Sequence, residues 1–282
     1  MIMISTYLCN IKIIFFLGII LLILLAVRII LLKKINKKYI DYASGATIGN
    51  EEIQEDYTAV ISKEYGTLAV LADGLGKNEC GRIASIIAVK TVSDLFEKEG
   101  TGERISYFLR RAFNEGNKEI LKRVERESGG ASVLAGVICD DLLYYALVGE
   151  AMLCIFRNNE LVRITEGHTM GEVAKKQYGA GKIERDKALY ALKEKKILYY
   201  MGQESFKNIE MSDPPVHLEK NDIVVLMSRG VFENIRWIEL EEILSQKRLK
   251  SYELCDEIID TLEYSNGHNN GSIVLMKYLG KK

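Results

Sequence analysis

Two residue pairs at the ends of neighbouring predicted strands have the types that bind hard divalent cations. Glu55 and Asp56 open the run DYTAVIS, while Asp73 and Gly74 close the run TLAVLAD. A short turn containing Gly66 joins the two runs, which predicts a hairpin. Three carboxylates and the Gly74 carbonyl would then converge, and Mg²⁺ and Mn²⁺ prefer such oxygen ligands. The alternative interpretation is that QEDY and ADG are ordinary polar turns at strand ends.

Arg229 is a second candidate, because it stands where another predicted strand ends. The run NDIVVLMS is typical of a buried strand, and Gly230 directly after Arg229 predicts a turn. A residue at such a position is either delivered to a site or faces solvent. Its surroundings in the fold must decide between the two.

Composition limits the classes of protein to which the chain can belong. It has 282 residues, 48% of them hydrophobic, with 38 Lys and Arg against 39 Asp and Glu and a net charge of -1. This is enough apolar material for a large core, and the charge balance predicts no nucleic-acid partner. The five cysteines show no CxxC or His-linked spacing. We therefore expect reduced thiols rather than a zinc site or a disulfide framework.

The N-terminal region predicts a membrane anchor. Residues 13–32, IIFFLGIILLILLAVRIILL, are all apolar or Gly except Arg28, and roughly 20 such residues span a bilayer as a helix. KKINKK follows with no small-residue cleavage site, which favours a retained helix over a cleaved signal peptide. Four lysines follow the segment and only Lys12 precedes it. The positive-inside rule thus predicts a single-pass protein of the cell membrane, with residues 1–12 extracytoplasmic, 33–44 a basic juxtamembrane segment and the C-terminal part cytoplasmic.

The remaining residues, 45–282, predict one domain with an α+β fold. The hairpin is followed by two stretches with the spacing of an apolar helix face, and then by four strand-like runs, SVLAGVIC, LLYYALVG, AMLCIF and ELVRIT. KILYYM and DIVVLMS predict two more strands, followed by two helices and the final strand SIVLMKY. Strands in runs with helices inserted in pairs indicate antiparallel sheets covered by helices.

Several blocks of the sequence resemble the metal-dependent protein phosphatases of the 2C type, the PPM family, in a bacterial-like form. IQEDYTAV, LAVLADGLGKNECGRIASIIAVKTV, LEKNDIVVLMSRGVFENI and HNNGSIVLM are similar, in order, to the family blocks NED, VADGMGG, SDG and DNIT. The resemblance extends from about Thr47 to the C-terminus. It implies a four-layer α/β/β/α sandwich of two antiparallel sheets flanked by helix pairs. It also implies removal of phosphate from serine and threonine by water activated between two divalent ions.

The resemblance assigns half of the family's metal site to residues that this sequence retains. Glu55, Asp56, Asp73 and the carbonyl of Gly74 match the family positions that hold one ion. They imply Mg²⁺ or Mn²⁺ as the cofactor. No side chain is assigned a catalytic role beyond these ligands.

The other matched positions are altered. The aspartate of SDG is Arg229, that of DNIT is Asn269, and that of the block GDSR is Glu150. The family arginine that precedes the acidic pair and holds the substrate phosphate aligns with Glu51. A guanidinium has only hydrogen-bond donors and stays protonated, so it cannot be a metal ligand. We therefore expect at most one ion, and we expect Glu51 to repel a phosphate dianion.

Arg229 then has three interpretations. It replaces the second ion and pairs with a carboxylate such as Glu51 or Asp73, or it is a fixed cation that binds a phosphorylated residue, or it faces solvent without a role. Lys77 replaces a common family glycine and is a second candidate for phosphate binding. His168 and His268 are weaker candidates for proton donors, but both lie in polar turns, where solvated histidines are the commoner outcome.

Residues 171–187 lie where the family carries a variable flap. They predict either a mobile loop or a surface that binds a partner.

Two functions remain for this chain. One is a membrane-anchored pseudophosphatase or very weak enzyme that binds a partner or phosphoprotein at the cytoplasmic face of the membrane. The other is an active serine/threonine phosphatase that uses the single retained half-site. In both cases the expected partner is a phosphoprotein or a membrane-associated signalling protein, and one helix holds the chain in the membrane.

Overall fold

The computed structural model describes residues 16–28, 39–76, 79–100, 104–124, 129–194, 196–265 and 269–280. The chain divides into two units, Met1–Tyr39 and Ile40–Lys282. In the first unit residues 16–28 are helical, and the other residues of the predicted anchor lie outside the described ranges. No helix within those ranges has both the length and the apolar character needed to cross a bilayer.

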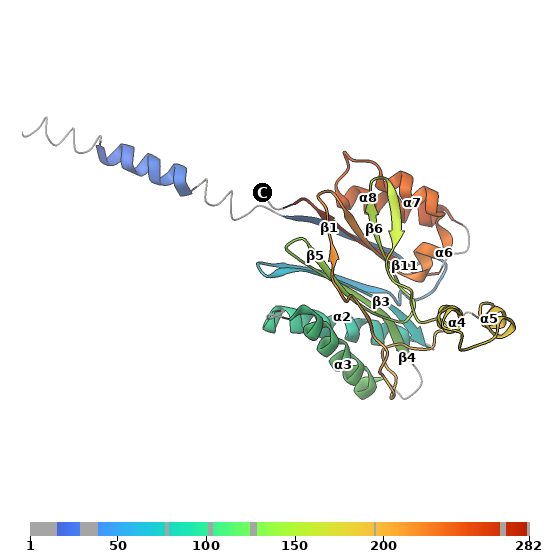
Figure 1. The fold of residues 1–282 in the computed structure, drawn as a ribbon. Coiled ribbons are helices and arrows are strands. Elements are labelled where there is room, and N and C mark those ends of the chain that lie inside the picture. The colour runs from blue at the N-terminus through green and yellow to red at the C-terminus, as the bar shows by residue number, and fades with distance from the viewer. Residues whose placement is uncertain are drawn as a thin grey trace, which may run out of the picture. The chain divides into compact units, whose positions relative to one another are not determined.

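Two antiparallel sheets form the centre of the second unit (Figure 1). The first has the strand order β1-β11-β10-β6-β7. Its strands are, in chain order, β1 (Ile40–Thr47), β6 (Met152–Arg157), β7 (Glu160–Arg163), β10 (Ile223–Met227) and β11 (Gly271–Tyr278).

The second sheet has the strand order β2-β3-β4-β5-β8, with β9 also paired to β5. Its strands are β2 (Tyr57–Lys63), β3 (Gly66–Gly76), β4 (Gly129–Cys139), β5 (Leu142–Val148), β8 (Glu210–Met211) and β9 (Val216–His217). Strands β2 and β3 pair in register from Tyr57 with Ala72 to Lys63 with Gly66, which confirms the predicted hairpin.

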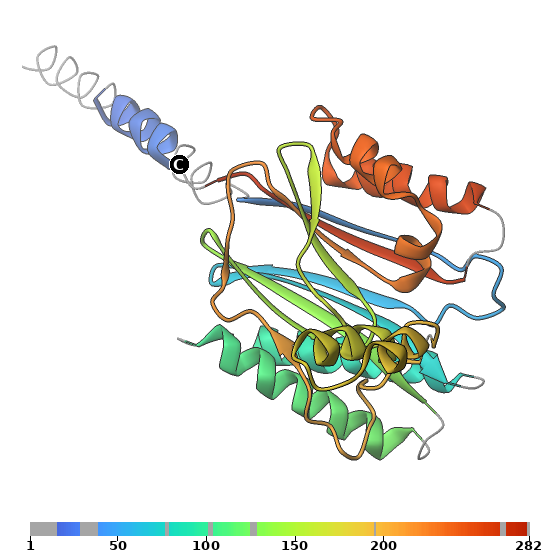
Figure 2. The ribbon, with the colours of Figure 1, turned by 45° about the vertical axis from the view of Figure 1, so that its right-hand side comes forward.

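Helices cover the outer face of each sheet (Figures 1 and 2). Helices α2 (Cys80–Glu99) and α3 (Ile105–Arg123) pack on the second sheet, while α6 (Arg229–Asn234), α7 (Trp237–Leu244) and α8 (Ser251–Tyr264) lie on the first. The buried face of α3 includes Ile105, Phe108, Leu109, Ala112 and Phe113, which is the apolar spacing that predicted this helix. The α+β fold with two antiparallel sheets and flanking helices is thus confirmed.

Three apolar clusters fill the spaces between these layers. One lies between α2, α3 and the second sheet, a second lies between the first sheet and α7 and α8, and a third joins the two sheets. Strands β4 and β10 are almost entirely buried because each has a neighbouring strand on both edges and a packed layer on both faces. These clusters hold the strand ends that carry the candidate site.

Four segments differ from the sequence-based expectation. The run KILYYM is not a strand; only Ile197 and Met201 make isolated bridges, to Thr169 and Ala131. Gly230 does not form a turn, because α6 begins at Arg229. Residues 40–44, which we expected in the juxtamembrane segment, form the first part of β1. Finally, the region 171–187 is largely helical rather than an irregular loop.

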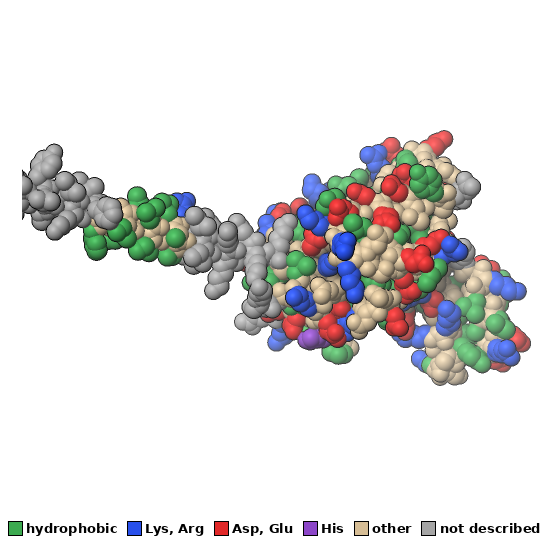
Figure 3. All heavy atoms as spheres, turned by 90° about the horizontal axis from the view of Figure 1, so that it is seen from above, with side chains coloured by type: hydrophobic (Ala, Val, Ile, Leu, Met, Phe, Trp, Pro, Cys, Tyr) green, Lys and Arg blue, Asp and Glu red, His purple; other side chains and the backbone are tan. Residues whose placement is uncertain are grey.

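The helices of that region are α4 (Met170–Gly179) and α5 (Arg185–Ala191), shown in gold in Figure 2. Thr169 starts α4 as its N-cap, because its Oγ1 accepts a hydrogen bond of 3.2 Å from the backbone N–H of Glu172. We call residues 170–191 the flap. Seen from above, acidic and basic side chains are interspersed over the surface of the domain (Figure 3).

Candidate functional site

The predicted site residues converge where strand ends of both sheets meet. Glu55 and Asp56 precede β2, Asp73 and Gly74 lie near the end of β3, and Arg229 opens α6 directly after β10 and Ser228. The structure therefore places the acidic residues and Arg229 at neighbouring strand ends, where the charge of Arg229 acts on Asp56 and Asp73.

Asn270 holds the acidic loop against the start of β11. Its Oδ1 accepts a hydrogen bond of 2.6 Å from the backbone N–H of Glu55, and its Nδ2 donates one of 2.8 Å to the carbonyl of Ile48. Ser85 of α2 also donates to the carbonyl of Glu55, at 2.5 Å. Sequence reasoning missed both residues. The signal in the sequence was the second Asn of HNNG, since a buried amide at a strand end needs hydrogen-bond partners.

Gly74 allows β3 to approach the start of α2. A Cβ at this position would lie 2.5 Å from the backbone carbon and oxygen of Gly81 and 2.9 Å from the carbonyl oxygen of Glu55. Such distances are far below an ordinary contact, so a side chain would push the acidic loop away from the helix. The absence of a side chain at Gly74 is thus a condition for the clustering of the carboxylates.

The three carboxylates of the site all have raised pKa values. Burial raises the pKa of Glu55, and the charges of Glu51 and Asp56 raise it further. Burial also raises the pKa of Asp56, and it raises that of Asp73 well above its ordinary value, where the charge of Asp56 adds to the effect. Each shift shows that ionisation costs more here than in water.

Groups from the first sheet reduce this cost only in part. The hydroxyls of Ser228 and Ser272 and the charge of Arg229 lower the pKa of Asp56. The backbone N–H of Arg229 donates to Asp73 and, with the charge of its side chain, opposes the rise of that pKa. Asp56 Oδ2 is nevertheless buried and has no hydrogen-bond partner among the described residues. A buried anionic oxygen in this state is suited to a bound cation.

Arg229 pairs with Glu150 rather than with Glu51 or Asp73. Its Nη1 lies 4.0 Å from Glu150 Oε2, at the limit of an ion pair, and the two side chains are 30% and 18% exposed. No side-chain ion pair joins Arg229 to another carboxylate in the described ranges. The reason for the difference is geometric, because Glu150 lies in the turn between β5 and β6, and β6 is the direct neighbour of β10. Two positions that both differ from the family pattern therefore meet in space.

The other predicted residues of this region are Glu51, Asn269, Lys77 and His268. Glu51 is exposed, yet it is close enough to Glu55 to raise the pKa of that carboxyl. Asn269 is exposed and directly precedes the buried Asn270. Lys77 and His268 lie outside the described residues.

His168 is buried, so the expectation of a solvated loop histidine was wrong. Its Nδ1 accepts a hydrogen bond of 3.2 Å from the backbone N–H of Gly149, and the backbone N–H of His168 donates to the carbonyl of Gly149 at 2.9 Å. The ring also contacts Tyr199 edge to face, with centroids 5.7 Å apart. Burial and the charge of Lys176 lower the pKa of His168.

Two serines that sequence reasoning missed connect the strands below Asp56. The backbone N–H of Ser272 donates to Ser228 Oγ at 2.9 Å, and the backbone N–H of Ser228 donates to the carbonyl of Ser272 at 2.9 Å. Small hydroxyl residues at the end of one predicted strand and the start of another were the available signal. They belong to the altered blocks LMSRGVF and HNNGSIVLM, which suggests that these blocks retain a structural role.

Comparisons with known proteins agree with this arrangement. A family model described as protein phosphatase 2C matches residues 46–252. The serine/threonine phosphatase stp of Listeria monocytogenes is 27% identical over 223 residues, which cover 77% of this chain and 86% of stp. The protein phosphatase PhpP of Streptococcus pneumoniae is 26% identical over 191 residues, covering 66% of this chain and 75% of PhpP.

Solved structures share the fold. The serine/threonine phosphatase of S. agalactiae superposes with a TM-score of 0.74 at 20% identity, over 84% of this chain and 99% of that one. The catalytic domain of the serine/threonine protein phosphatase PstP, solved in complex with two manganese ions, superposes with a TM-score of 0.67 at 22% identity, over 84% and 97%. The chain belongs to the protein phosphatase 2C family of serine/threonine phosphatases.

The residues near Asp56 have the chemistry of divalent-cation ligands, but they are not assembled as a metal site. Among the described residues, no three His, Cys, Asp or Glu side chains lie as close together as an assembled metal site requires. The acidic half nevertheless offers carboxylates with raised pKa values and the buried, unpartnered Oδ2 of Asp56. The opposite half presents the guanidinium of Arg229, which repels a cation and cannot bind one. The oxygen donors on the side of Asp56 are thus of the kind that a hard divalent cation prefers.

Proposed function

We propose that this chain is a pseudophosphatase or very weak phosphatase of the 2C type, in which Arg229 takes the place of the second metal ion. The observation that carries the proposal is the approach of Arg229 Nη1 to Glu150 Oε2, at 4.0 Å beside the acidic cluster. In the family two ions provide the activated water and neutralise the phosphoryl oxygens. A guanidinium supplies positive charge in the same region but no ligand position for water.

The retained half supports binding of one Mg²⁺ or Mn²⁺ ion. Glu55, Asp56, Asp73 and the carbonyl of Gly74 would hold it, and when bound it would supply Lewis acidity to a water or phosphoryl oxygen. The role of this chain's own residues is to concentrate negative charge in a partly buried loop. Asn270 and Ser85 keep that loop in place through the backbone of Glu55.

A role for Arg229 as a reader of phosphorylated residues has less support. Its charge acts on Asp56 and Asp73 and lies beside Glu150, so three carboxylates already share one guanidinium. A phosphate dianion placed there would meet this negative charge before it met the cation. The alternative that a specific observation does favour is an active enzyme with one metal, because the acidic half-site is intact.

The location of the protein belongs to the same proposal. We place residues 13–32 in the cell membrane as a single helix, with residues 1–12 outside the cytoplasm and the phosphatase-like domain inside it. The support is the apolar run and the excess of lysines after it. A phosphoprotein or signalling protein at the cytoplasmic face of the membrane is then the partner that the domain can reach.

Hydrolysis of p-nitrophenyl phosphate and of a phosphothreonine peptide with Mn²⁺ tests the proposal. The full chain in detergent is compared with Asp73→Asn, which removes a retained ligand, and with a variant that carries Glu51→Arg, Arg229→Asp and Asn269→Asp. We expect the hydrolysis rate of wild type to equal that of the Asp73→Asn blank. The rate of the triple variant should exceed both by about 100-fold, which is the order of effect of one restored contact to the transition state. Wild-type turnover well above the blank would instead support the active single-metal enzyme.

A further inference from the structure

A cleft separate from the acidic cluster opens between α4 of the flap and the segment that precedes β8. Its volume is about 500 Å³, which is within the range of clefts that bind small ligands or a few residues of a peptide. We call it the flap cleft. Residues from both walls line it, among them Val173, Lys176, Lys182, Tyr199, Lys207 and Ile209.

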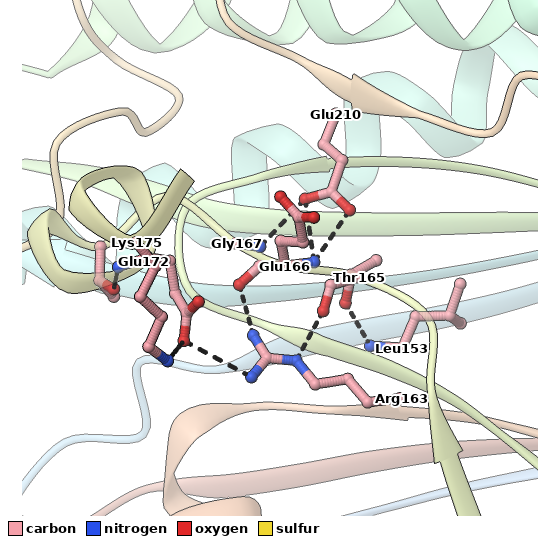
Figure 4. A network of polar contacts seen from close by, with 9 residues as sticks. Leu153, Arg163, Thr165, Glu166, Gly167, Glu172, Lys175 and Glu210 are labelled. Atoms are coloured by element: carbon pink, nitrogen blue, oxygen red, sulfur yellow. Dashed lines mark hydrogen bonds and ion pairs between the residues drawn. The ribbon is translucent and has the colours of Figure 1, made fainter. Parts of the chain in front are cut away.

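The carboxylates at one end of the flap cleft are already engaged (Figure 4). Glu210 accepts hydrogen bonds of 3.0 Å from the backbone N–H groups of Glu166 and Gly167. Glu172 lies 2.9 Å from Lys175 Nζ and 3.8 Å from Arg163 Nη1. These contacts hold the wall of the cleft: Lys175 and Arg163 offset the charge of Glu172, and backbone donors stabilise Glu210.

The lysines of the cleft are less compensated. Lys182 and Lys207 form no ion pair with any residue in the described ranges. Lys176 pairs with Glu166 at 3.2 Å, but the two side chains are 77% and 64% exposed, so the pair contributes little. The rim therefore has positive charge available for a ligand, above a floor that includes Val173, Tyr199 and Ile209. This combination fits an acidic ligand with some apolar side chains.

The backbone beside the cleft is suited to an extended peptide. Residues 206–209 lie outside regular secondary structure and form no backbone hydrogen bond with another described residue. They lead directly into β8, which is the edge strand of the second sheet. Unpaired backbone at a sheet edge can accept a further strand, and main-chain hydrogen bonds then add to the affinity from side chains.

His168 connects the flap cleft to the candidate site. It lines the cleft, and its ring and backbone hold Gly149, the neighbour of Glu150. Only His168 and Gly149 would then lie between a ligand in the cleft and Glu150, the carboxylate that meets Arg229. This proximity explains how one phosphoprotein could contact both places, with its phosphorylated residue near the site and its flanking residues in the cleft.

We propose that the flap cleft docks an acidic, extended peptide segment of the partner phosphoprotein, which lies along residues 206–209 and pairs with Lys182 and Lys207. The inference rests on the proposed function for the existence of such a partner. It does not depend on whether the site turns over phosphate, because the docking residues are separate from the acidic cluster.

Fluorescence anisotropy with the full chain in detergent tests the docking. The probe is a labelled ten-residue peptide in which Asp and Glu alternate with Val and Thr. We expect saturable binding that weakens at least about tenfold when Lys182→Glu and Lys207→Glu are combined, since two attractions become repulsions. The matched control combines Lys187→Glu in the flap with Lys193→Glu just after it. It changes the net charge equally at lysines that do not line the cleft, and it should lose less than about threefold in affinity.

Two further probes separate a peptide from a simple anion. The same peptide with proline at alternate positions keeps its acidic side chains but loses backbone donors, and it should bind at least about tenfold more weakly. Citrate should compete only at millimolar concentration. The inference is overturned if wild type does not bind the peptide, if both charge-reversal pairs weaken binding equally, or if the proline peptide binds as well as the original. Mn²⁺ binding and turnover, measured on the same samples, report on the proposed function independently of these outcomes.

Discussion

The two halves of the candidate site come from different sheets, and they differ in what they can bind. The half at the ends of β2 and β3 keeps Glu55, Asp56 and Asp73, all with raised pKa values. The half that follows β10 and precedes β11 contains Arg229 and Asn269, at the positions that the resemblance aligns with acidic family residues. Asn270 connects the two halves through the backbone N–H of Glu55, and Ser228 and Ser272 join the two strands of the second half. The comparison teaches that strand ends of one fold can place carboxylates on one side of a site and a guanidinium on the other.

The largest expected effect concerns the number of bound ions. Titration calorimetry of the metal-free chain with Mn²⁺ should show at most one ion per chain for wild type and none of comparable affinity for Asp73→Asn. Arg229→Asp together with Asn269→Asp should allow a second ion, because a repelling cation is replaced by oxygen ligands. Two ions of similar affinity in wild type would show that the halves do not differ in the way we describe.

The next prediction tests whether the backbone of the altered half is still required. A Cβ at Gly230 would lie 1.9 Å from the backbone oxygen of Asn270, so Gly230→Ala should displace α6 or the start of β11. We expect a loss of about 2 to 3 kcal/mol in the free energy of unfolding by urea, the usual cost of overpacking. Gly179→Ala is the control, since a Cβ there meets nothing within 4 Å, and it should be neutral or stabilising by up to about 1 kcal/mol. Equal effects of the two substitutions would contradict the close packing.

The acidic half should be less stable when its carboxylates are ionised without a cation. The pKa of Asp56 is higher in the folded chain than its ordinary value of 3.8, so ionisation disfavours the folded state and stability is lost as the pH rises. In EDTA at pH 7.5, Asp56→Asn should raise the free energy of unfolding by on the order of 1 kcal/mol. The gain should shrink as the pH falls towards the range where wild-type Asp56 is protonated in the folded state. A gain that grows with falling pH would be the wrong sign for a raised pKa.

The smallest effect is expected for the contact between Arg229 and Glu150. At 4.0 Å and partly exposed, the pair should contribute little to stability. A double-mutant cycle with Arg229→Met and Glu150→Gln, followed by urea unfolding, should give a coupling energy below about 1 kcal/mol. A much larger value would mean that the guanidinium, besides taking the place of the second ion, also contributes to the stability of the fold.

Parts of the fold could be predicted from local patterns, and others could not. The hairpin of β2 and β3 and the buried face of α3 follow alternation and helical spacing, both of which are local properties. Strand β1 was missed because its residues are mostly half-exposed, which leaves no clear alternation in IDYASGAT. The run KILYYM has strand-like residues, but only two isolated bridges form there, because Met201 pairs with Ala131 of β4 and Ile197 pairs with Thr169 before α4 rather than with one common strand.

The sequence by itself determined the acidic residues of the site, the order of the strands that carry them and the types of the residues that replace the family's ligands. The tertiary structure decided which of these residues meet. Only folding places Glu150 rather than Glu51 or Asp73 beside the guanidinium of Arg229, and only folding buries His168 against Gly149. The physical reason is that pairing and burial depend on distances between strand ends that are remote in the chain, and the desolvation that shifts each pKa arises when the two sheets and their helices pack.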